Sequence, residues 1–427
     1  MIPSQDATGA DAPPLQQEDV DVDVESTGDG TEKEKNTHEK NKKKKKKKKR
    51  RRRKIVTPEE ISAASYVRHW VFPDSPPDDA DIIVQLSTSK PAGRILFELH
   101  SHSSCSDGFL SPTALVDRAH TRGVKVLALT DHDTMAGITE AIEAAHKLGI
   151  KIIPGVEISA SVFSKEEAKM DEPVHILAYY GSWGPTKYNE LEEMLTRIRE
   201  GRHFRAKKIL SKLTQLKMPL KFEQVSRIAG TGVAPGRVHV ARAMVEAGYV
   251  ENIRQAFSKY LYDGGPAYAS GNEPRAEEVI RLICRTGGVA VLAHPWALKN
   301  PPAVVKSLKA SGLHAIEVYR SDGKLSGLSD IADSYGLVKV GGSDFHGRSG
   351  CEEPDLGSVH LPVISIFEFL KLADPIWCEA LKDILTSGAD GEKKFPFCKW
   401  ISDRPCHDCC EIQILDCLQL TRTEGSK

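Results

Sequence analysis

The 427-residue sequence lacks the usual marks of membrane and secreted proteins. No uninterrupted apolar run approaches the roughly 18–20 residues that span a bilayer. The N-terminal stretch MIPSQDATGADAPPLQQEDVDVDVE is acidic and has no apolar core, so a secretory signal is not expected. The nine cysteines are odd in number and irregularly spaced. This pattern favours free thiols in a reducing compartment over a disulfide framework.

The chain has no net charge, but its charges are unevenly distributed. Residues 1–54 carry 16 Lys and Arg against 11 Asp and Glu, and the remainder carries 43 against 48. The body is therefore not basic overall, and any affinity for phosphate should be local. Residues 1–58 form an acidic and then polybasic leader that we expect to be disordered. Its run Lys42–Lys54 favours binding to a nuclear import receptor or to nucleic acid, and hence a nuclear or cytoplasmic location; a solvated charge run is the alternative.

Seven short apolar runs alternate with helical stretches from residue 94 onward. This alternation predicts βα units and a parallel sheet. One helix is expected over Ser111–Arg122, and a second over Met135–Leu148 that ends at Gly149. The seven runs are Ile95–Leu99, Val124–Leu129, Ile150–Val156, Val174–Tyr180, Val289–Ala293, His314–Val318 and Leu337–Val340.

Two regions fall outside this alternation. Residues 186–285 are mostly helical, which predicts an inserted helical subdomain. Residues 363–427 are expected to form a C-terminal helix followed by an irregular tail that contains cysteines. The segment PCHDCCEIQILDC in that tail lacks the second well-spaced ligand pair of a zinc knuckle, so an irregular terminus is the simpler interpretation.

Potential metal ligands follow five of the apolar runs. In parallel βα folds the C-terminal ends of the strands and the loops after them form the active site. Five separate buried-polar arrangements would be costly, whereas shared cations would satisfy all of these groups together. The sequence therefore predicts a metal site at one end of a sheet. The segments concerned are His100-x-His102 with Asp107, Asp131-His132-Asp133, Glu157, His294-Pro295 and Asp344-Phe345-His346.

The ordered motifs HSHSSCSDG, TDHDT, PGVEIS, VHILAYY, LAHP and GGSDFHG resemble those of the polymerase-and-histidinol-phosphatase (PHP) domain. The resemblance covers roughly residues 94–350, inside a phosphoesterase domain expected over residues 94–362. It implies an α/β fold, a distorted (β/α)7 TIM-like barrel. It also implies two or three divalent ions in a trinuclear type of centre. One ion would be held by His100, His102, Glu157 and Asp344, a second by Glu157, His175 and His294, and a third by Asp107, His132 and His346.

His175 is nominated by the resemblance alone, because it lies near the start of its apolar run. The mixture of imidazole and carboxylate ligands suits Mn, Fe or Zn better than Mg or Ca. Such a centre would hydrolyse phosphoesters with a metal-bound hydroxide, so no side-chain nucleophile is expected. Cys105 is expected to be a packing residue.

The substrate implied is a phosphorylated nucleotide. The PHP branch that acts on nucleoside 3′,5′-bisphosphates and on the 5′ end of short RNA has a Gly-Arg-x-His stretch similar to residues 236–239, although x is usually Pro and is Val238 here. Arg237, His239 and, from EVYRSD, Arg320 are therefore candidates for binding substrate phosphate. The alternatives are a histidinol-phosphate-type phosphatase and an inactive metal-binding module that interacts with nucleic acid.

Overall fold

The computed structural model describes residues 56–74, 82, 86, 94–162, 172–323, 327–348 and 353–387. The basic run Lys42–Lys54 and the cysteine-containing tail lie outside these residues. In the described part of the chain, no helix is both long enough and apolar enough to cross a bilayer. Cys105 and Cys284 are free thiols, as expected. Cys378 is disulfide-bonded, contrary to expectation, because bond formation depends on proximity in the fold and not on sequence spacing.

All seven predicted strands are present, in one sheet whose order follows the chain. Beyond the last strand, Phe345 forms a parallel bridge with Ser101, which follows the first strand. The N–H of His102 donates to the carbonyl of Phe345 at 2.8 Å, so backbone hydrogen bonds close the sheet into a barrel. The strands are β1 (Leu96–Glu98), β2 (Val124–Leu129), β3 (Lys151–Val162), β4 (Glu172–Tyr179), β5 (Val289–Leu292), β6 (Ala315–Tyr319) and β7 (Val338–Gly341).

The prediction of a wholly parallel sheet is wrong at β4. This strand pairs antiparallel with both β3 and β5, while the other neighbours are parallel. A parallel pair needs a long crossover connection, usually a helix, whereas an antiparallel pair can be joined by a short one. Only nine residues separate β3 from β4, fewer than the dozen or more that a parallel crossover needs. The N-terminal end of β4 therefore lies beside the C-terminal ends of its neighbours.

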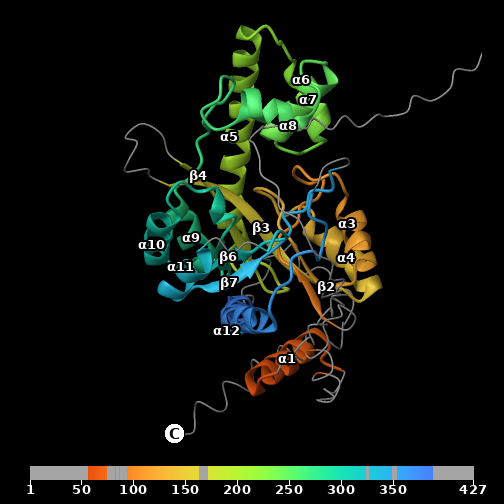
Figure 1. Ribbon diagram of the computed structural model, residues 1–427, viewed down its shortest axis with the longest axis vertical. Helices are drawn as coiled ribbons and strands as arrows, with labels where there is room; N and C mark the ends of the chain where they lie inside the picture. Colours follow the sequence, from red (N-terminus) through yellow and green to blue (C-terminus); the bar gives the residue numbers. More distant parts are fainter. Residues whose placement is uncertain are drawn as a thin grey trace, which may run out of the picture. The chain divides into compact units, whose positions relative to one another are not determined.

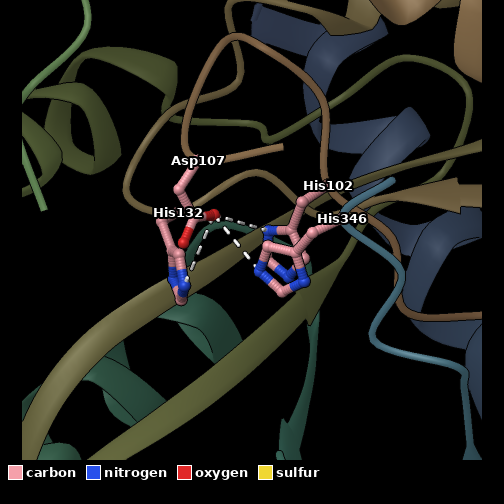
Figure 2. Close-up of side chains that lie close together, drawn as sticks. All are labelled: His102, Asp107, His132 and His346. Carbon is pink, nitrogen blue, oxygen red and sulfur yellow. Dashed lines mark ion pairs between the residues drawn. The ribbon is translucent and has the colours of Figure 1, made fainter. Parts of the chain in front are cut away.

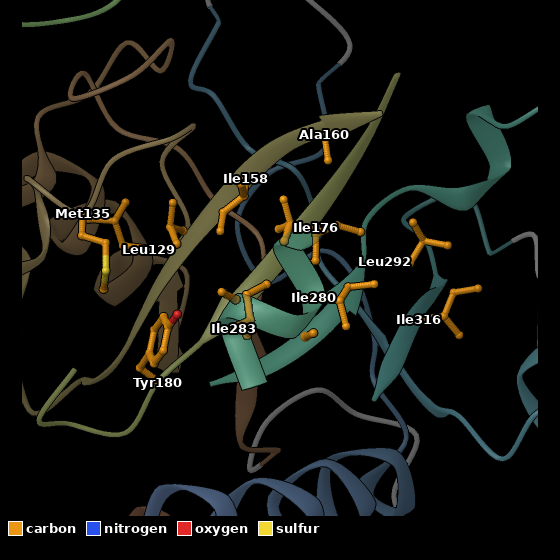
Figure 3. Packing of buried hydrophobic residues seen from close by; sticks show 14 of the residues in the cluster. Leu129, Met135, Ile158, Ala160, Ile176, Tyr180, Ile280, Ile283, Leu292 and Ile316 are labelled. Carbon is orange, nitrogen blue, oxygen red and sulfur yellow. The ribbon is translucent and has the colours of Figure 1, made fainter. Parts of the chain in front are cut away.

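Helices cover the outer face of the barrel (Figure 1). The predicted helix boundaries hold at Ser111, which caps the first of these helices, and at Gly149, whose left-handed backbone ends the second. Helix α9 (Ala276–Arg285) packs its Ile280 and Ile283 against β4 and β5 (Figure 3). The covering helices are α3 (Pro112–Thr121), α4 (Ile138–Leu148), α9 (Ala276–Arg285), α10 (Pro301–Ala310) and α11 (Leu328–Ser334).

A second apolar cluster contains the alternate residues of the strands, such as Val126 and Leu177, together with residues of α1 (Pro58–Val71) and α12 (Val363–Ser387). The Nε1 of Trp70 on α1 donates to Asp374 on α12 at 3.1 Å. These two helices thus cover one side of the barrel core together.

The helical segment between β4 and β5 has a core of its own, distinct from that of the barrel. We call the helices that share this core the cap. The first helix, α5 (Tyr188–Gln215), belongs to both cores, because Leu195 and Ile198 pack with the barrel and Ile209 and Leu213 pack with the cap. Figure 1 shows α5 running from the barrel to α6 and α7. The remaining cap elements are α6 (Phe222–Ala229), α7 (Arg237–Glu246), α8 (Ile253–Ala256) and the π-helical turn η1 (Phe257–Leu261).

Candidate metal centre

The nine side chains nominated as metal ligands gather in one cluster at the end of the barrel that faces the cap. The clustered residues are His100, His102, Asp107, His132, Glu157, His175, His294, Asp344 and His346. They come from the loops after β1, β2, β5 and β7, and from β3 and β4 themselves. Residues far apart in the sequence are therefore brought within direct contact of one another.

The carboxylate of Glu157 occupies the centre of this cluster. Its Oε2 lies 3.2 Å from the Nε2 atoms of both His100 and His102. Those two ring nitrogens also lie 3.3 and 3.1 Å from Oδ1 of Asp344. Two imidazoles and two carboxylates thus direct one atom each toward a common point, which is the arrangement of a four-ligand metal site.

The other oxygen of Glu157 faces a second point. Its Oε1 lies 2.9 Å from Nδ1 of His175 and 3.0 Å from Nε2 of His294, and these two nitrogens are 3.2 Å apart. The antiparallel direction of β4 explains the position of His175. Its carbonyl accepts from Ala293 N–H at 3.1 Å, so the start of β4 lies beside the end of β5. A parallel reading of the sheet gives no reason for this placement.

Asp107 contacts the remaining imidazoles (Figure 2). Its Oδ1 lies 3.3 Å from Nε2 of His346, 3.9 Å from Nδ1 of His102 and 4.0 Å from Nε2 of His132. His132 also approaches Glu157, with 3.2 Å between Nδ1 and Oε2. Asp107 and Glu157 therefore lie on two sides of His132, and the three groups of candidate ligands are contiguous.

Several buried polar atoms of the cluster lack the hydrogen bonds that burial normally requires. No hydrogen-bond partner exists, among the described residues, for His100 Nε2, His102 Nδ1, Asp107 Oδ1 or His132 Nδ1. Leaving such groups without hydrogen bonds is costly, and buried ligand atoms that converge on shared points fit cations. The residues present therefore fit the divalent metal ions that this donor set suggests.

The charges of the cluster favour a bound cation. Burial opposes the ionisation of Asp107, but the imidazoles of His346 and His132 hold its pKa well below the ordinary value. Burial likewise disfavours the charged form of His100, yet Glu317 and Glu157 hold its pKa well above the ordinary value. The same negative field that retains a proton on His100 would stabilise a metal ion in its place.

Two buried glutamates that sequence reasoning missed support the ligands. Glu317 on β6 lies 3.0 Å from His100 through Oε1 and accepts from the His294 N–H at 2.7 Å through Oε2. Glu98 on β1 accepts from the backbone N–H groups of His100, Ser343 and Gly357. Both glutamates could have been found from the sequence, because each is a carboxylate inside an apolar strand. A carboxylate buried in this way needs polar partners.

The backbone is strained or tightly packed around the cluster. Among the described non-glycine residues only four have positive φ, and three of them belong to this region: Asp133, His294 and Asp344. Such conformations cost about 1–3 kcal/mol each and persist where surrounding contacts impose them. Gly342 must also remain glycine, because a Cβ there would lie 2.4 Å from the Cβ of His100. This close approach allows the loop after β7 to bring Asp344 beside β1.

A pocket of about 490 Å³ lies between the cluster and the cap. Its barrel side includes Asp107 and His132, and its cap side includes residues 229–234 and His239. Arg199 and Arg202 of α5 also line it. Neither arginine was nominated from the sequence, because a basic helix face is ordinarily solvated and only the fold shows which side meets the cluster.

Arg202 is held by a buried ion pair. Its Nε lies 2.6 Å from Oδ2 of Asp133, and its Nη2 donates to the hydroxyl of Ser159 at 2.7 Å. Arg199 donates to the carbonyl of Asp133 at 2.8 Å. The loop after β2 therefore connects to α5 through Asp133, which places two guanidinium groups beside the candidate metal ligands.

Among the predicted phosphate-binding residues, His239 lines the pocket. Its Nδ1 accepts from the N–H of Gly236 at 2.9 Å, so the neutral ring carries its hydrogen on Nε2. Burial lowers the pKa of His239 to about 4. His239 is therefore a neutral donor at physiological pH.

Arg237 and Arg320 do not line this pocket. Arg237 points into the cap, where its Nη1 lies 2.5 Å from Asp263. Arg320 lies over the ring of Trp296, 4.5 Å from its centroid, and pairs with Asp322. Their role in binding phosphate stays a prediction.

Comparison with known proteins agrees with this geometry. The model of the PHP domain matches residues 98–262. The 3′,5′-nucleoside bisphosphate phosphatase of Chromobacterium violaceum is 34% identical over 278 residues, which cover 62% of this chain and 94% of that protein. The 5′-3′ exoribonuclease of Haemophilus influenzae is 35% identical over 58% of this chain and 89% of its own length.

Two solved structures are similar in fold. One, from Bifidobacterium adolescentis, has a TM-score of 0.57, with 30% identity, and the match covers 66% of this chain and 96% of that one. The other, an amidohydrolase from Chromobacterium violaceum with bound sulfate, has a TM-score of 0.56, with 32% identity over 67% and 96% of the two chains. The chain belongs to the PHP domain family. It is a metal-dependent phosphoesterase, a hydrolase of phosphoester bonds.

Proposed function

We propose that this phosphoesterase removes the 3′-phosphate of nucleoside 3′,5′-bisphosphates. The observation that carries the proposal is the presence of two arginines, Arg199 and Arg202, in the same pocket as the candidate metal ligands Asp107 and His132. A substrate with two phosphates would use both features. One phosphate would lie on the metal ions, and the other would contact the guanidinium groups, which are well suited to phosphate.

The proposed metal ligands are the nine clustered residues, and the proposed cofactors are two or three Mn, Fe or Zn ions. Bound there, such ions polarise a phosphoester and lower the pKa of water. The chain itself supplies the positions: His100 and His102 are fixed by β1, and Glu157 lies between two groups of ligands. His239 would donate a hydrogen bond from Nε2 to a phosphate oxygen. The pocket volume, about 490 Å³, is that of a site for a small ligand and suits a mononucleotide.

A second candidate activity is release of nucleotides from the 5′ end of short RNA. It is favoured by the similarity to proteins described as 5′-3′ exoribonucleases, at 35% and 34% identity. Both reactions would hydrolyse a phosphoester at the metal ions. They would differ in the group released, which is a phosphate from the bisphosphonucleotide and a nucleotide from the RNA. A histidinol-phosphate-type phosphatase would use the ligands with a different pocket.

The test uses purified protein loaded with Mn, Fe or Zn. Bound metal is measured first, and the release of phosphate or nucleotide is then followed with a 3′,5′-bisphosphonucleotide, a 5′-phosphorylated RNA of five residues and histidinol phosphate. We expect stoichiometric metal and fastest turnover of the bisphosphonucleotide. His100→Ala or Asp344→Ala should abolish turnover and leave the fold largely intact. A metal-loaded protein that hydrolyses only histidinol phosphate would contradict the proposal, and one that binds metal without hydrolysing any of the three would be the inactive module.

A further inference from the structure

An aromatic ring of the barrel and an arginine of the cap meet close to the pocket. Phe109 follows the loop that contains Asp107, and Arg242 lies one helical turn after His239 on α7. The Cζ of Arg242 lies 4.6 Å from the centroid of the Phe109 ring. Neither Phe109 nor Arg242 lines the pocket itself, but Asp107 and His239, which are close to them in the chain, do. The pair therefore joins the barrel and the cap beside the pocket.

The loop that presents Phe109 is held rigidly. Ser104 N–H donates to the carbonyl of Leu110 at 2.7 Å, and Phe109 N–H donates to that of His346 at 2.7 Å. Gly108 permits this tight turn, since a Cβ there would lie 2.5 Å from the carbonyl oxygen of His102. Despite this fixed backbone, 36% of Phe109 is exposed to solvent. The ring is thus a preorganised apolar surface beside a polar pocket.

We propose that the exposed face of Phe109 is the stacking surface for the nucleobase of the substrate. The inference rests on the proposed nucleotide substrate and adds the site of its base. Arg242 lies against the ring, and a base would stack on the side left open. Stacking on an aromatic ring tolerates every base, because each has a π-face. The proposed subsite therefore predicts a preference for nucleotides over sugar phosphates without a preference among bases.

The position of the ring agrees with the size of a nucleotide. Asp107, which contacts three imidazoles of the cluster, precedes Phe109 by two residues. A nucleotide with one phosphate beside Asp107 would extend out of the pocket toward Phe109 for its base to stack on the ring. The guanidinium of Arg242 adds positive charge at this edge, which favours a phosphorylated ligand.

The test compares the binding of two ligands that share ribose and the 5′-phosphate, one with a base on C1 and the other with a hydroxyl there. The affinity of the metal-loaded protein for a nucleoside 5′-monophosphate and for ribose 5-phosphate is measured by calorimetry, which requires no turnover. We expect the wild-type protein to bind the nucleotide about 5- to 150-fold more tightly, from the strength of one base–aromatic stack. Phe109→Leu should remove most of this preference, because it should weaken the binding of the nucleotide and leave that of ribose 5-phosphate unchanged. Phe109→Trp should retain the preference for the nucleotide.

Phe204 provides a matched control, because it is a 59% exposed ring on α5 with the Nζ of Lys208 4.6 Å from its centroid. Phe204→Leu should leave both affinities unchanged. If Phe109→Leu weakened both ligands equally, or changed only the melting temperature, the pair would be a connection between barrel and cap and the inference would be overturned. Equal binding of the two ligands by the wild type, or binding of neither, would also overturn it. The proposed function is judged separately, by phosphate release from the bisphosphonucleotide.

Discussion

The Nδ1 of His100 lies 3.0 Å from Oε1 of Glu317, while the other nitrogen of the same ring faces Glu157 at 3.2 Å. One imidazole therefore connects a supporting carboxylate on β6 to the centre of the candidate metal site. A carboxylate behind a ligating histidine fixes the orientation and tautomer of the ring and increases its basicity. Glu317 also accepts the backbone N–H of His294, so it holds two candidate ligands at once.

Glu317→Gln should weaken metal binding. Gln keeps the size of the side chain but removes the negative charge, and loss of such a partner typically costs about 10- to 100-fold in metal affinity. Competition of the purified variant with a calibrated chelator measures the change. Glu140→Gln, at an exposed glutamate that accepts from Thr113, is the control and should bind metal normally. Unaltered affinity in Glu317→Gln would show that its charge does not support the site.

Arg199 and Arg202 should differ in what their loss does to the protein. Arg199→Gln should raise the KM for the bisphosphonucleotide and have a small effect on stability. Within the described part of the chain, Arg199 hydrogen-bonds to the carbonyl of Asp133 and to Glu192 and Thr196 of its own helix, and it is partly exposed. Arg202→Gln leaves the buried carboxylate of Asp133 without its counter-charge. Removing one partner of a buried ion pair costs about 3–5 kcal/mol in the free energy of unfolding. Urea unfolding and steady-state kinetics separate the two effects.

A double variant tests whether Arg202 acts on substrate or only on stability. Arg202→Gln with Asp133→Asn removes both charges and should recover part of the lost stability. The KM should stay high if the guanidinium of Arg202 binds phosphate. Recovery of KM along with stability would restrict Arg202 to a structural role.

His239→Asn should reduce kcat/KM for the bisphosphonucleotide without a change in the pH profile. The Asn oxygen can still accept from Gly236 N–H, whereas the Nε2–H donor is lost. A hydrogen bond to a charged group is worth about 1.5–3 kcal/mol, or about 10- to 150-fold. Because burial lowers the pKa of His239 to about 4, the ring is neutral from pH 6 to 8. The loss in kcat/KM should therefore be equal at pH 6 and at pH 8. A loss confined to pH 6 would indicate a charged His239.

Metal affinity should rise with pH and metal uptake should release protons. Burial opposes the charged form of His346, yet Asp107 and Asp344 hold its pKa well above the ordinary value, and His100 behaves alike. In the metal-free protein both rings therefore carry protons at pH 7 that must leave on metal binding. Their contribution to metal-free stability is fully present below pH ~6.5 and is lost as pH rises through the folded-state pKa values. Calorimetry in two buffers of different ionisation enthalpy measures the release, and an absence of protons released would contradict the expectation.

The basic run should affect location and leave catalysis unchanged. Deletion of residues 42–54 from a fluorescently tagged chain should move it from the nucleus to the cytoplasm, because 13 consecutive Lys and Arg are the only such run in the sequence. Turnover of the bisphosphonucleotide by the purified variant should match that of the full chain. An unchanged distribution in cells would show that the run does not direct nuclear import and is a solvated charge segment.

The sequence by itself determined the local elements of this protein and the chemistry they carry. Apolar runs such as Val124–Leu129 have the length of buried strands and alternate with helical stretches, which favours parallel βα units. Polar residues directly after such strands then share one end of the barrel. Eight of the nine candidate ligands follow from that rule or from the turn at Asp107. Ser111 and Gly149 mark helix ends because their effects act within one turn.

Only the tertiary structure decided what depends on direction and on distant packing. A strand has the same apolar pattern in either direction, so the antiparallel course of β4, and with it the reason for His175, is absent from the pattern. The sequence likewise does not distinguish which basic residues of α5 face the site. The packing of α5 against both the barrel core and the cap core fixes the orientation of the helix. That orientation places Arg199 and Arg202 in the pocket, while Arg237 turns toward Asp263. Side chains acquire such partners through long-range contacts, which no local spacing specifies.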